Sequence, residues 1–74
     1  MIQLKEAIDL IEKQKQPYIV KAAAETDELY ILSLNNGSEG YETVNKSTGE
    51  TGFMWIWEYM DLAQEGKAKR IVIS

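Results

Sequence analysis

The fold of this chain is decided by the stretch Glu25-Thr26-Asp27-Glu28-Leu29-Tyr30-Ile31-Leu32-Ser33-Leu34. Its first four residues are polar and predict a turn, and the six that follow predict a β-strand. Residues 18–24 predict a strand before the turn, so the two strands form a hairpin. Alternation in the first strand separates two faces: Tyr18, Val20, Ala22 and Ala24 on one, and Ile19, Lys21, Ala23 and Glu25 on the other.

Toward the N-terminus the pattern becomes helical. Apolar residues recur at the spacing of one helix face, and charged residues fall on the opposite face. The apolar residues are Leu4, Ala7, Ile8 and Ile11. We expect a helix over residues 2–15, ended before Pro17, because proline disfavours the helical conformation of the residue that precedes it. The small side chains of residues 22–24 are expected to let a helix lie close over the sheet.

Toward the C-terminus the sequence predicts more strands and a second helix. The sequence predicts a strand over residues 41–46. The glycine, asparagine and serine content of the residues on either side predicts a loop over 35–40 and a turn over 47–50. A helix over about residues 56–64 and a last strand over 68–74 complete the chain, with Gly66 following the helix.

These elements predict an α+β fold in a single domain, residues 1–74. We expect an antiparallel sheet of three to five strands with two helices packed on one face, in the order α-β-β-β-(β)-α-β. The bracketed strand is residues 51–55, which the pattern leaves open. The 74 residues make a core small enough that burial alone barely stabilises it.

The segment Phe53-Met54-Trp55-Ile56-Trp57-Glu58-Tyr59-Met60 holds both tryptophans and one of the four tyrosines. If residues 55–64 are one helix, Trp57 falls on its polar face. If residues 53–57 are a strand, Phe53, Trp55 and Trp57 share one face. Both alternatives leave a large side chain that so small a core can hardly bury. Such a ring either caps the edge of the core or serves as an interface anchor.

Composition excludes several classes of function. The net charge of −4, from 12 acidic and 8 basic residues, disfavours direct nucleic-acid binding. Charges interrupt every apolar run near the N-terminus, and no run approaches the roughly eighteen apolar residues of a membrane span. We therefore expect neither a signal peptide nor a membrane span, and a cytoplasmic location. There is no histidine or cysteine, and no glycine pattern for phosphate, so no catalytic, cofactor or metal residues are predicted and an enzyme is not expected.

One further segment, residues 40–52, has the sequence Gly-Tyr-Glu-Thr-Val-Asn-Lys-Ser-Thr-Gly-Glu-Thr-Gly. A strand ending in Val-(Asp/Asn)-Lys and followed by Thr-Gly-Glu resembles small bacterial and phage proteins of the immunity protein 35 type. The similarity covers about half of the chain. It implies a toxin-neutralising or other partner-binding role and brings no catalytic residues.

The expected function is therefore a non-enzymatic protein-binding module, inhibitor or immunity-like, of bacterial or phage origin. Its partner would dock on Trp55, Trp57 and Tyr59, with Glu58 and Asp61 forming an acidic rim that suits a basic protein. One alternative is a homodimer built on the aromatic face or the last strand. Another is an acidic mimic of nucleic acid.

Overall fold

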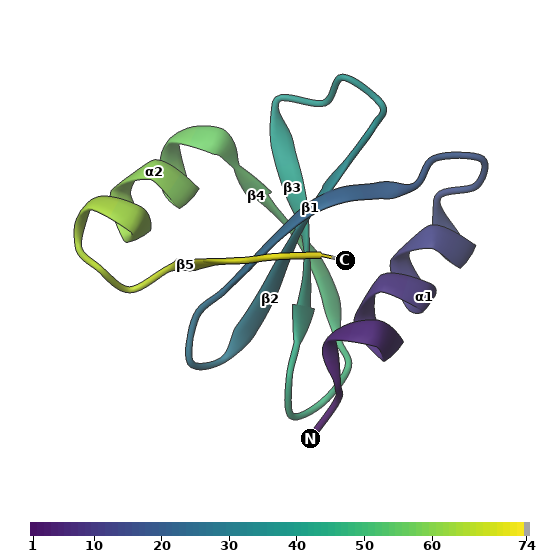
Figure 1. Cartoon of the computed structure of the whole chain (residues 1–74), viewed down its shortest axis with the longest axis horizontal. Coiled ribbons are helices and arrows are strands. Elements are labelled where there is room, and N and C mark those ends of the chain that lie inside the picture. The colour runs from purple at the N-terminus through teal and green to yellow at the C-terminus, as the bar shows by residue number, and fades with distance from the viewer. Residues whose placement is uncertain (74) are drawn as a thin grey trace.

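The computed structural model describes residues 1–73, which form two helices and a five-stranded antiparallel sheet (Figure 1). The predicted α+β class and element order are confirmed, including the strand that the sequence left open. In chain order the elements are α1 (Leu4–Gln14), β1 (Val20–Glu25), β2 (Leu29–Leu34), β3 (Gly40–Asn45), β4 (Thr51–Trp55), α2 (Ile56–Gln64) and β5 (Lys69–Ile71).

The first four strands follow one another across the sheet, and β5 then returns to lie beside β1. The resulting order is β4-β3-β2-β1-β5, with every neighbouring pair antiparallel. The last strand is shorter than predicted and covers Lys69–Ile71, while Ser74, the end of the predicted strand, lies outside the described residues. Strands β4 and β5 form the two edges.

The two helices cover opposite faces of the sheet, so the expectation that both pack on one face is wrong. Neighbouring strand residues point to opposite faces. Ala23 packs with Ala7 and Ile11 of α1, whereas Ala24 packs in a second cluster with Tyr59 and Leu62 of α2. The two helices lie on either side of the strands in Figure 1.

Both faces are covered because β2 is apolar on both. Leu32 contributes to the cluster beneath α1 and Ile31 to the cluster beneath α2, and each is almost completely buried. A strand with only one apolar face would leave the other to solvent, as in many antiparallel sheets. Ala23 serves the predicted purpose, because it lies under α1 against Ala7 and Ile11, whereas Ala24 belongs to the second cluster on the other face.

A bulge in β1 breaks the predicted alternation. Val20 pairs with Leu34 and Ala22 pairs with Ser33, so Lys21 is an extra residue with no partner of its own in β2. Val20 and Ala23 consequently contact the same core cluster, although strict alternation would separate them. The predicted grouping of Val20 with Ala22 and Ala24 is therefore wrong, because an inserted residue reverses the face of everything before it.

Candidate functional site

The aromatic segment changes from strand to helix without a connecting loop. Strand β4 ends at Trp55 and α2 begins at Ile56. The backbone N–H of Trp55 donates to the Glu58 carboxylate at 3.3 Å, which is the position expected for a carboxylate that caps the first turn. The N–H of Ile56 donates to the carbonyl of Glu39 at 3.1 Å. The two alternatives from the sequence, a strand over residues 53–57 and a helix over residues 55–64, are therefore each correct for part of the segment.

Three large rings stack along this junction. The rings of Phe53 and Trp55 meet edge to face with centroids 4.9 Å apart, and those of Trp55 and Trp57 lie parallel within 5°, also at 4.9 Å. Both arrangements are attractive for aromatic rings. The three residues nevertheless remain 47%, 43% and 55% exposed. The stack is thus a surface feature and contributes little to the core.

The strand register explains why Phe53 and Trp55 stay exposed. They alternate with Met54, which is buried against the α2 face, so they project from the face on which α1 packs. Helix α1 lies over β1 and β2, and the sheet end at β4 is left open. The absence of a side chain at Gly40 leaves space for the ring of Phe53, because a Cβ at this position would lie within 3 Å of two ring carbons.

Two further apolar side chains extend the stack along α2. Ile56 and Met60 are both exposed, and they are neighbours on the helix because four residues separate them. Met60 is also three residues from Trp57. We call the set Phe53, Trp55, Ile56, Trp57 and Met60 the aromatic surface. Contiguous exposed apolar area of this kind is characteristic of contact sites for other molecules.

The five residues predicted to bind a partner do not all lie together. Trp55 and Trp57 stack, and the exposed Asp61 follows Trp57 by one helical turn. Glu58 is exposed as well, but its carboxylate also caps α2. Tyr59 lies on the opposite side of the helix, half-buried, with its ring 4.9 Å from that of Tyr41. Tyr59 therefore holds α2 onto the sheet.

Sequence reasoning missed Ile56 and Met60 as surface residues. On a helix over residues 55–64, both lie on one broad apolar arc, which consists of Trp55, Ile56, Tyr59, Met60, Leu62 and Ala63. In the structure α2 contains no fully buried residue, and Tyr59 and Leu62 make its contacts with the sheet. The signal available beforehand was the size of the arc, which is larger than 74 residues can cover.

The residues that carry the resemblance fold a turn. Val44 is buried in the core, and the Asn45 side-chain oxygen accepts from the N–H groups of Ser47 and Thr48 at 2.8 and 3.0 Å. Gly49 adopts φ +78°, a conformation that favours glycine. Lys46 is buried and makes an ion pair with Glu25. This motif explains the β3–β4 hairpin, and its exposed residues Ser47, Thr48 and Glu50 belong to the turn or follow it directly.

Comparison with known proteins does not extend these observations. The chain matches no protein-family model, no curated protein and no solved structure. Within residues 1–73, no three acidic, histidine or cysteine side chains cluster as metal ligands would. Neither described helix has the length and apolar character needed to cross a bilayer.

Proposed function

We propose that the protein is a non-enzymatic protein-binding module that docks through its aromatic surface. The observation that carries the proposal is the exposed Trp57, which points away from the side of α2 packed on the sheet and stacks on Trp55. Tryptophan is among the residues most often found at the centre of binding energy in interfaces. A stacked pair is also held rigidly, which lowers the entropy lost on binding.

The partner we propose is a basic protein, and the role is that of an inhibitor or immunity-like protein from a bacterium or phage. The role and origin draw on the resemblance of residues 40–52. The basic character follows from Glu58 and Asp61, exposed beside the aromatic surface, and from the net charge of −4. Opposite charges around an apolar centre raise the association rate and orient the partner.

A second copy of this chain fits the aromatic surface less well. A symmetric dimer places the same patch of both copies face to face. The acidic residues 58 and 61 of one copy would then lie near those of the other, where like charges repel. The proposal therefore favours a different, basic protein.

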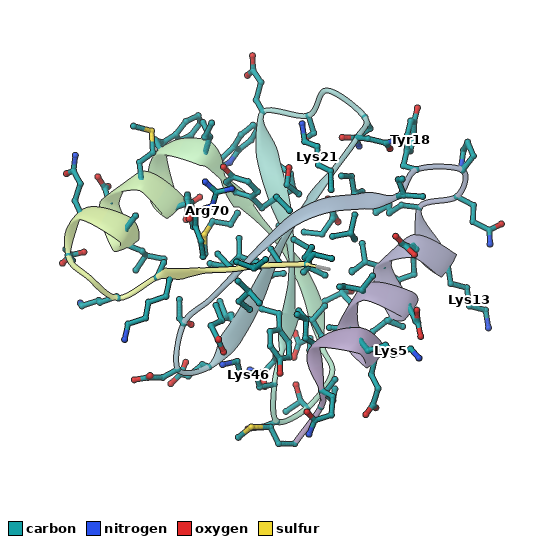
Figure 2. The ribbon with its side chains drawn as sticks, in the orientation of Figure 1. Lys5, Lys13, Tyr18, Lys21, Lys46 and Arg70 are labelled. Atoms are coloured by element: carbon teal, nitrogen blue, oxygen red, sulfur yellow. The ribbon has the colours of Figure 1, made fainter. Side chains whose placement is uncertain are left out.

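The test is the substitution Trp57→Ala, compared with Tyr18→Ala. Tyr18 is an exposed aromatic residue that lies near the end of α1, far from α2 (Figure 2). A basic protein captured from the native host should be retained by the wild type and by Tyr18→Ala. With the purified pair, Trp57→Ala should weaken the Kd about 30-fold, a loss of about 2 kcal/mol typical of a hot spot.

The melting temperature distinguishes binding from folding. Because Trp57 is more exposed than buried, Trp57→Ala should leave the melting temperature nearly unchanged. A large fall would assign Trp57 to the core. Full protection of both indoles from acrylamide quenching in the isolated monomer would contradict the proposal, and sedimentation showing a dimer that Trp57→Ala dissociates would replace the basic partner with a second copy.

A further inference from the structure

A hollow of about 330 Å³ lies on the face of the sheet that α2 covers only in part. Its floor is formed by the small residues Ala22 and Ala24 with Ile31, and the rings of Tyr41 and Tyr59 line it as well. The volume is at the lower end of the range for small-molecule sites. The alanines create the hollow, because larger side chains at these positions would fill it.

Two cations line this hollow, and the backbone explains the position of each. The β1 bulge makes Lys21 an extra residue in front of Ala22, so that it lines the same hollow instead of pointing to the other face. Bulges often redirect a side chain in this way beside functional sites. Arg70 of β5 pairs directly with Ala24 and therefore projects from the same face.

The charge of the hollow is opposite to that of the whole protein. Its lining contains Lys21 and Arg70 and no carboxylate. Among residues 1–73 the ion pairs are Lys15–Glu42, Lys46–Glu25 and Lys67–Glu65, so neither cation of the hollow is neutralised by a salt bridge. The hydroxyl of Ser33 adds a hydrogen-bonding group to the lining. A chain of net charge −4 thus presents a locally positive, partly apolar depression.

We propose that this hollow binds a small organic anion. Arg70 and Lys21 hold its carboxylate or phosphate group, since a guanidinium donates two parallel hydrogen bonds to such oxyanions and an ammonium adds a point charge. The apolar body of the ligand rests on Ala22 and Ala24 beside the two tyrosine rings. The aromatic surface is formed by other residues, so this proposal does not depend on the proposed function.

Amide chemical shifts measured by NMR test this proposal in the full-length protein at constant ionic strength. The probes are phenyl phosphate, benzoate, inorganic phosphate and the uncharged benzyl alcohol. We expect saturable shifts confined to residues 21–24, 31–33, 41 and 70 with phenyl phosphate or benzoate. Whichever of these two probes binds more tightly shows whether the hollow prefers a phosphate or a carboxylate. Inorganic phosphate should bind more weakly because it lacks the apolar body, and benzyl alcohol because it lacks the charge.

The variants Lys21→Gln and Arg70→Gln should each weaken binding of the preferred probe about tenfold, the loss of one charge-assisted contact. The single variants Lys5→Gln and Lys13→Gln are the matched controls, because each removes one positive charge from α1, away from the hollow (Figure 2). The dispersion of the spectrum shows that each variant is folded. Shifts spread over all lysines without saturation, or equal binding by Arg70→Gln, would overturn the proposal.

Discussion

At the scale of single residues, Lys46 links three separate parts of the chain. Its ammonium donates to the Glu25 carboxylate at 2.6 Å and to the Thr26 carbonyl at 2.7 Å, and it lies 5.0 Å from the centre of the Tyr30 ring. Its backbone carbonyl accepts from the N–H of Ile2, ahead of α1. Lys46 therefore joins the β1–β2 turn, the β3–β4 turn and the N-terminus.

Replacing Lys46 by methionine should lower the free energy of unfolding by about 1–3 kcal/mol, because a half-buried carbonyl and a half-exposed carboxylate lose their shared donor. Methionine keeps the apolar stem, so the change isolates the charge. Urea denaturation measures the loss. Lys67→Met is the control: its pair with Glu65 is well exposed at 3.6 Å and should contribute under about 1 kcal/mol. Equal effects of the two substitutions would contradict a structural role for Lys46.

At the scale of elements, α2 is held on the sheet more weakly than α1. It has no fully buried residue, and Tyr59 and Leu62 supply its packing against Tyr41, Met54 and the rest of the second cluster. By contrast, Ala7 and Ile11 of α1 are completely buried. Few buried contacts mean that a segment opens at a lower free energy than the rest of the protein.

Hydrogen exchange should therefore be faster for the amides of α2 than for those of β2. Leu62→Ala should lower the opening free energy of α2 by about 1–2 kcal/mol, less than the loss at a fully buried leucine. Met60→Ala, on the exposed side of the same helix, should change it by under about 0.5 kcal/mol. Amides of α2 that exchange as slowly as those of β2 would show that this helix is packed as firmly as the sheet.

At the scale of the whole molecule, the sheet is a central layer between two small cores. Ile31 and Leu32 are consecutive in β2, point to opposite faces and are both buried. This arrangement distributes the apolar residues of a 74-residue chain over two clusters. It also explains why little apolar material remains to cover the aromatic surface at the edge strand β4.

Ile31→Ala and Leu32→Ala should each cost about 2–5 kcal/mol of unfolding free energy, since both remove atoms from a packed interior. Ile19→Ala, at an exposed position before β1, should stay within about 0.5 kcal/mol of the wild type. Thermal or urea denaturation of the three variants provides the measurement. A nearly neutral Ile31→Ala would mean that the α2 face is open to solvent, and would restore the expectation of a sheet covered on one side.

The sequence by itself determined the helices, the strands other than residues 51–55 and the turns between them, because these follow from local periodicity and turn residues. The helix predicted over residues 2–15, which the structure has at Leu4–Gln14, and the strand at 29–34 were both evident in this way, as was the size of the aromatic segment. The sequence also showed that this segment carried more ring surface than a small core absorbs. Trp55 and Trp57 were named as candidates for that reason.

Only the tertiary structure decided which face each helix covers, where Lys21 points and how the aromatic rings meet. These features depend on residues far apart in the chain: Ser33 opposite the β1 bulge, Gly40 beneath Phe53, and Arg70 beside Ala24. A one-residue change of register reverses every side chain of a strand, and no local pattern reveals it. The hollow and the exposed aromatic stack are consequences of that long-range pairing.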